Sequence, residues 1–74
     1  MSATEARELR EHADAIADSY DSGEAQEIQN QLYAMARALQ SGCELWDLIA
    51  RARPKTKTQQ QTIQEMRAVQ AATY

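Results

Sequence analysis

Residues 24–53 read EAQEIQNQLYAMARALQSGCELWDLIARAR, and this stretch decides the fold. Apolar side chains recur in it at steps of three and four residues, namely at Ala25, Ile28, Leu32, Met35 and Leu39. That spacing places them on one face of an α-helix. The same heptad pattern continues past Gly42 to Trp46 and Ile49.

Gly42 leaves two interpretations open for this stretch. Either one helix spans residues 24–53, or Gly42 closes a helix in the left-handed conformation and a short third helix starts at Cys43. A glycine inside a helix costs only about 1 kcal/mol relative to alanine. We therefore favour the long helix, with a bend or break at Gly42 left open. Pro54 ends the helix in either case, because its ring cannot continue the hydrogen-bond ladder.

A first helix is predicted over residues 3–20. Its apolar stripe follows the same spacing, at Ala6, Leu9, Ala13, Ile16 and Tyr20. Ser2 and Glu5 fit a capping box at its start, and Asp21 and Glu24 fit a second one. Because Ser22 and Gly23 between the latter two are turn residues, the pattern predicts a tight turn and an antiparallel helical hairpin.

A last helix is predicted over residues 58–72, capped by Thr56 or Thr58. Its bulky apolar residues are Ile63, Met66 and Val69. A helix with so few apolar residues either packs as a thin lid on the hairpin or orders only on a partner. The fold class predicted for residues 1–74 is a single all-α domain, a small bundle of three or four helices.

The composition provides little volume for a core. Of the 74 residues 43% are hydrophobic, but 14 of these are alanine, and phenylalanine is absent. Domains this small commonly need a disulfide, a metal or a second copy. One cysteine and one histidine build neither an internal disulfide nor a zinc site. We therefore expect no metal and no cofactor, and we expect a homodimer or a bound protein partner.

The chain is expected to be cytoplasmic. It has no apolar run of the roughly 18 residues that span a bilayer, and its first ten residues are charged where a signal peptide is hydrophobic. The single thiol, Cys43, fits a reducing compartment and is expected to be a small buried apolar residue.

Charge is distributed unevenly along the chain. Residues 1–48 hold ten acids and three bases, whereas residues 49–74 hold five bases and one acid, within a net charge of -3. Such a chain can recognise a charged partner or the opposite end of its own copy. A stripe at helical spacing is expected to form a solvated acidic face; it consists of Glu5, Glu8, Glu11, Asp14 and Asp18.

The densest apolar patch is residues 45–49, Leu-Trp-Asp-Leu-Ile, which wraps around more than half of a helix. Tryptophan is enriched at the centres of protein interfaces. We therefore predict a partner-binding surface formed by Leu45, Trp46, Ile49 and Tyr33, to which Tyr74 adds contact area. The alternative, in which Trp46 only anchors the core of a minimal bundle, remains open.

A second candidate surface is basic. It comprises Arg51, Arg53, Lys55, Lys57 and Arg67, next to three glutamines at residues 59–61. Such side chains bind phosphates and base edges in nucleic acids. The match to a helix-turn-helix is loose because the turn is charged, and a pI of about 5.0 is unlike most nucleic-acid-binding domains.

No pair of residues fits a catalytic base and nucleophile. Glu8 and His12 stand one helical turn apart and are expected to form an exposed pair. We therefore expect a non-enzymatic protein-protein interaction module, acting as a regulator, inhibitor or co-chaperone-like adaptor through an apolar helix face. The alternative is a nucleic-acid-binding regulator.

Overall fold

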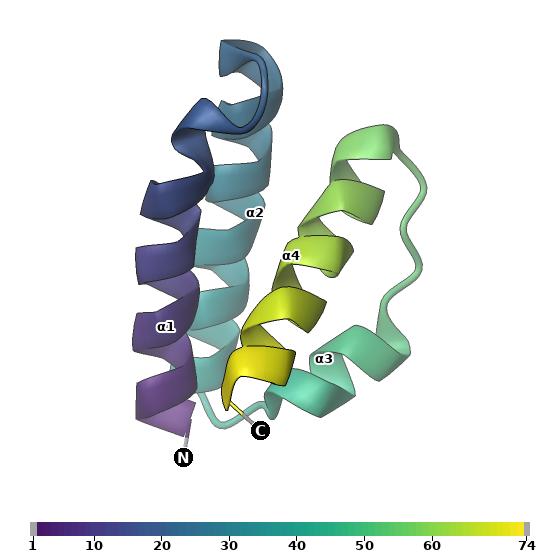
Figure 1. The fold of residues 1–74 in the computed structure, drawn as a ribbon. Helices are drawn as coiled ribbons and strands as arrows, with labels where there is room; N and C mark the ends of the chain where they lie inside the picture. The colour runs from purple at the N-terminus through teal and green to yellow at the C-terminus, as the bar shows by residue number, and fades with distance from the viewer. Residues whose placement is uncertain (1, 74) are drawn as a thin grey trace.

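The computed structural model describes residues 2–73, and the side chains of residues 3–73, as an all-helical protein (Figure 1). Its elements in chain order are α1 (Ser2–Ala15), the short 3-10 helix η1 (Ile16–Asp18), α2 (Ser22–Gln40), α3 (Leu45–Arg51) and α4 (Lys57–Thr73). The predicted all-α class is therefore confirmed, with four α-helices. Ser2 was expected to cap the first helix and Tyr74 to add contact area, but both lie outside the described side chains.

The helices α1 and α2 lie antiparallel, as the sequence predicted (Figure 1). Their facing stripes are fully or almost fully buried and consist of Ala6, Leu9 and Ala13 from α1, Ile16 from η1, and Ala25, Ile28, Leu32, Ala36 and Leu39 from α2. Alanine leaves room for the two backbones to approach, and the leucines and isoleucines fill the space between them. The hairpin is the base on which α4 packs, and α3 packs mainly against α4.

The turn between these helices is held by the backbone. Ser19 N–H donates to Ile16 O at 2.9 Å, and Ala25 N–H donates to Asp21 O at 2.7 Å. Asp21 occupies the N-cap position of α2 but makes no side-chain capping bond. The capping box expected from Asp21 and Glu24 is therefore not formed.

The favoured single helix over residues 24–53 is a wrong prediction, because α2 ends at Gln40. The structure has the alternative, a helix closed at Gly42 and a short third helix. Gly42 has a φ of 109°, its N–H donates to Leu39 O at 3.1 Å, and Cys43 N–H donates to Ala38 O at 3.1 Å. This pair of bonds is the Schellman motif, which satisfies the last carbonyls of a helix and needs a residue with positive φ. The chain then turns, and Leu45 at the start of α3 is fully buried in the core.

A complete capping box starts α4. Thr56 Oγ1 accepts from Gln59 N–H at 3.2 Å, and Gln59 Oε1 accepts from Thr56 N–H at 3.3 Å. Of the two expected caps, Thr56 is thus the one used, and the helix begins at Lys57, one residue earlier than predicted. The reciprocal bonds satisfy backbone donors that would otherwise lack a partner inside the helix.

The last helix packs on the hairpin (Figure 1). Met66 is fully buried and Val69 is 5% exposed, both within the same core as the hairpin residues. Of the two alternatives for this helix, the structure has the packed lid. The radius of gyration is 11.2 Å, close to the roughly 11 Å expected of a compact chain of this length.

Two expectations about single side chains are wrong. Cys43 is exposed, because it follows the Gly42 turn and does not continue a helix face. Glu5 is buried at 1% exposure, although Glu11, Asp14 and Asp18 of the same acidic stripe are exposed as expected. Within residues 2–73, none of the helices has the length and apolar character that crossing a membrane requires.

The two glycines are predicted to respond oppositely to alanine. No atom lies within 4 Å of a Cβ added at either position, so the difference is conformational. Gly42→Ala places a Cβ at positive φ and should lower the free energy of unfolding by about 1–2 kcal/mol. Gly23→Ala, within α2, should raise it by about 0.5–1 kcal/mol. Urea titration followed by circular dichroism measures both, and equal effects of the same sign would contradict the assignment of the turn.

Candidate functional site

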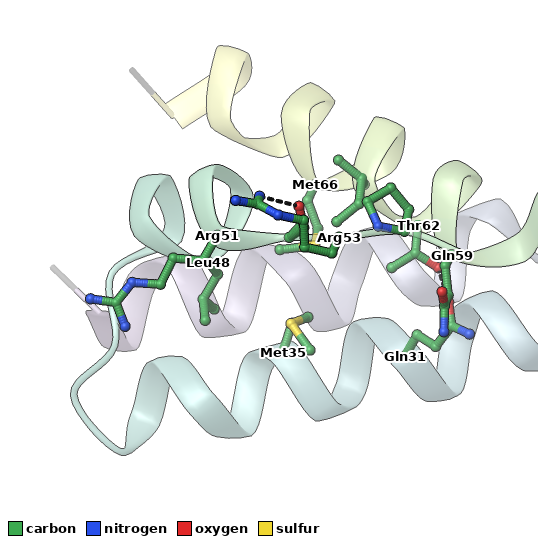
Figure 2. Close-up of a pocket in the computed structure, with 11 residues that line it drawn as sticks. Gln31, Met35, Leu48, Arg51, Arg53, Gln59, Thr62 and Met66 are labelled. Atoms are coloured by element: carbon green, nitrogen blue, oxygen red, sulfur yellow. Dashed lines mark hydrogen bonds between the residues drawn. The ribbon is translucent and has the colours of Figure 1, made fainter. Parts of the chain in front are cut away.

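A groove opens between α2, α3, the following loop and α4. Its volume is about 350 Å³, and eleven residues line it: Gln31, Met35, Leu48, Arg51, Ala52, Arg53, Pro54, Gln59, Thr62, Ile63 and Met66. Figure 2 shows Met35 reaching from α2, Leu48 from α3 and Met66 from α4, with Gln31, Gln59 and Thr62 gathered at one end. Met35 and Met66, which are 31 residues apart in the sequence, thus line one largely apolar concave surface.

Two arginines, Arg51 and Arg53, line this groove. Arg51 is 80% exposed and its Nε lies 3.1 Å from Asp47 Oδ1 on the same helix. Arg53 is exposed and donates from Nη1 to the carbonyl oxygen of Ala52 at 3.1 Å (Figure 2). A guanidinium that donates to a neutral carbonyl keeps its charge available for a carboxylate. The groove therefore combines an apolar floor with positive charge on its wall.

The predicted partner-binding residues lie in different environments. Leu45 is fully buried, so in this fold it is a core residue that a partner does not reach. Ile49 and Tyr33 are half-buried against the core. Trp46 is 55% exposed and is the exposed large hydrophobic side chain among residues 3–73. The interpretation of Trp46 as a core anchor is thus wrong, and its role in binding a partner stays a prediction.

The indole and the groove lie on opposite flanks of α3. Successive residues of a helix are rotated by about 100°, so Trp46 and Leu48 point in directions about 160° apart. Ile49 is only about 60° from Trp46 and extends the same flank. The structure thus presents a protruding aromatic side chain on one flank of a seven-residue helix and a recess on the other.

The basic residues do not form one cluster. All five are exposed, but Arg51 pairs with Asp47 and the Nζ of Lys57 lies 3.9 Å from Glu24 Oε2. Lys57 and Arg67 share the outer face of α4 with Gln60 and Gln64, at steps of three and four residues. This face carries positive charge and amides, while Arg51 and Arg53 belong to the groove.

A polar cluster that the sequence did not predict joins α1, the hairpin turn and α4. Glu65 accepts from the Tyr20 hydroxyl at 2.6 Å, and its other oxygen lies 2.6 Å from His12 Nε2. The Glu65 side chain is 19% exposed. His12 was expected to pair locally with Glu8, yet its partner is 53 residues away. No periodic pattern could have indicated this contact, because its members lie on three separate segments.

The hydrogen bonds of this cluster hold segments of the fold together. The hydrogen bond to Glu65, with burial and the nearby negative charges, raises the pKa of Tyr20 to about 12. The phenol therefore stays protonated at neutral pH and keeps donating to Glu65. A similar hydrogen bond to Asp14 raises the pKa of Tyr33. Tyr20 thus attaches the hairpin turn to α4, and Tyr33 attaches α2 to α1.

Other possible sites are few in the described part of the chain. A second recess of about 320 Å³ lies between α1 and α4, around Ala15, Ala68 and Ala72. Residues 2–73 contain no group of three or more histidine, cysteine, aspartate or glutamate side chains arranged to hold a metal ion. In comparisons with known proteins, the chain matches no family model, no curated protein and no solved structure.

The hydrogen bond from the Tyr20 hydroxyl to Glu65, which holds α4 to the hairpin turn, is predicted to depend on the protonation of Tyr20. Because the folded pKa of about 12 exceeds the ordinary value of 10.0, this stabilisation is complete below pH 10 and is lost as the pH rises to about 12. Tyr20→Phe should lower the free energy of unfolding by about 1 kcal/mol at pH 7. The difference between the two proteins should then shrink towards zero at pH 12.

The measurement is urea unfolding of both proteins between pH 7 and pH 12, in steps of about half a pH unit. Tyr33→Phe is the matched control, since it removes the same hydroxyl from an exposed hydrogen bond. A deficit of the Tyr20→Phe protein that stayed constant through this pH range would show that the hydroxyl does not hold α4.

Proposed function

We propose that the protein is a non-enzymatic interaction module that binds a segment of a partner protein in the groove between α2, α3 and α4. It acts as a small adaptor or regulator, because its binding surface and not a reactive group is its distinctive feature. The observation that carries the proposal is the combination, in one recess, of an apolar floor with the arginines on its wall.

The apolar residues on the floor of the groove favour an apolar side chain as its occupant. Met35, Leu48, Ile63 and Met66 all line the recess, and methionine adapts its shape to different partners. A cavity of about 150 Å³ already holds a molecule of benzene. The volume of about 350 Å³ is therefore enough for one large aliphatic or aromatic side chain of a docked segment.

The positive charge on the wall of the groove favours acidic residues next to the apolar side chain of a bound segment. Arg53 donates to a backbone carbonyl, and Lys55 next to it is also exposed. Cations at the rim of an apolar interface select partners of opposite charge and repel basic ones. The preferred partner segment thus presents a large apolar residue with aspartate or glutamate within one helical turn of it.

Selection from a random peptide library displayed on phage tests this proposal. We expect enriched peptides to share one large apolar residue with acidic residues close by. Arg53→Glu should weaken the binding of a selected peptide at least about fivefold, measured by fluorescence anisotropy, because it reverses the charge beside the groove.

Arg67→Glu is the matched control for this experiment. It makes the same change of charge on the outer face of α4, away from the groove lining, and should leave peptide affinity nearly unchanged. The proposal fails if no peptide is enriched, if basic peptides are enriched, or if the two charge reversals have equal effects.

Nucleic-acid binding is a second candidate function, which one specific observation favours. The outer face of α4 exposes Lys57, Gln60, Gln64 and Arg67, while Glu65, the acid of this helix, faces His12 and Tyr20. A stripe of cations and amides without acids is a chemistry that contacts phosphates and base edges. Against it stand the net charge of -3 and the contact between Lys57 and Glu24.

An electrophoretic mobility shift with duplex DNA and with single-stranded RNA, at several salt concentrations, tests this candidate. We expect a salt-sensitive shift whose dependence on log salt falls by about one unit for each phosphate contact removed, as by Lys57→Gln or Arg67→Gln. Gln26→Ala, at an exposed position on the hairpin, is the control. The absence of any shift at about 50 mM salt would exclude it.

A further inference from the structure

We infer that the groove of one copy takes the Trp46 side chain of a second copy, so that the chain associates with itself head to tail. This inference rests on the proposed function, because it uses the same groove and names its occupant. The evidence is that the chain carries both halves of such a contact, a protruding indole and a recess of fitting chemistry, at places where they cannot meet within one copy.

The first half of the contact is the start of α3. Trp46 is 55% exposed, whereas the leucine, isoleucine, valine and methionine side chains of residues 3–73 are buried or half-buried. The exposed Glu44 lies two residues before it, whereas Asp47 pairs with Arg51 on the same helix. This segment therefore has the chemistry that the groove selects, a large apolar side chain accompanied by an acidic group.

The second half is the groove itself. Its volume of about 350 Å³ exceeds that of an indole, and its methionines are soft groups that contact aromatic rings well. Arg53 on its wall is available to a carboxylate of the incoming segment, since its own hydrogen bond goes to the carbonyl of Ala52. Burial of the indole and pairing of these charges favour the same orientation.

The placement of the two halves favours a head-to-tail contact over a closed two-fold dimer. Trp46 and Leu48 point about 160° apart around α3, so the indole and the groove lie on opposite flanks of that helix. A two-fold dimer would have to bring both flanks to one interface. A contact between unlike surfaces instead continues from copy to copy, as a ring or an open chain. The inferred head-to-tail assembly thus differs from the homodimer expected from the sequence.

One indole in one groove is a small interface, well below the roughly 1,200 Å² of a standard complex. The expected dissociation constant is accordingly about 10–1,000 μM. Because Trp46 is the single tryptophan of the chain, its fluorescence reports the contact directly. We expect its emission to move to shorter wavelength, and the weight-average mass in sedimentation to rise, as the protein concentration increases.

Two variants that each remove one half of the contact provide the decisive test. Trp46→Ala removes the indole and leaves the groove intact. Ala52→Phe fills the groove with its own ring and leaves the indole intact, at a half-buried position outside the helices. Each variant alone should stay monomeric, and an equimolar mixture should form only a one-to-one complex, because neither partner can extend the chain.

A second pair of variants covers the case in which Ala52→Phe does not fold, as judged by circular dichroism. Arg53→Glu should weaken self-association at least about fivefold, whereas Arg67→Glu should leave it nearly unchanged. The inference is overturned if the protein remains monomeric up to about 1 mM with constant Trp46 emission, or if Trp46→Ala associates as the parent does. Peptide selection on the groove together with a monomeric protein would overturn the self-association alone and leave the proposed function standing.

Discussion

The left-handed turn at Gly42 is the constraint on which the rest of the structure depends. It ends α2 by satisfying the carbonyls of Ala38 and Leu39, and it changes the direction of the chain within four residues. Leu45 can then enter the core, and α3 packs against α4 instead of extending α2. Without this turn Leu48 and Arg53 would lie beyond the end of α2, far from Met35, and no groove would form between them.

The hairpin could be predicted because its information is local. The steps of three and four residues in α1 and α2 fix which faces are apolar, and most of the buried residues are those of the predicted stripes. Ala36 is buried in addition, and Met35 and Tyr20 are only partly buried. The end of α2 could not be predicted in the same way. A helix that continues through glycine costs about 1 kcal/mol, and a left-handed turn at glycine is comparably cheap. The burial of Leu45 decides between them, and it depends on residues distant in the sequence.

The candidate site was predicted less well than the fold. The enrichment of tryptophan at interfaces was the basis for including Trp46 in the predicted surface, and its side chain is exposed in the structure. Leu45 was misassigned because the rotation of α3 relative to the core follows from the turn at Gly42. The groove and the cluster of His12, Tyr20 and Glu65 join segments up to 53 residues apart. Contacts of this kind leave no periodic signal, so they become visible only once the chain is folded.

The shortest helix and the loop that follows it form a wall of the groove. Leu48 and Arg51 belong to α3, which has seven residues, and Ala52 and Pro54 belong to the connector to α4. An isolated helix of that length does not persist in water, so tertiary contacts must hold it. Binding in the groove and ordering of its wall are therefore coupled. A ligand that fills the groove also stabilises α3 and the connector, and part of the binding free energy is used to order them.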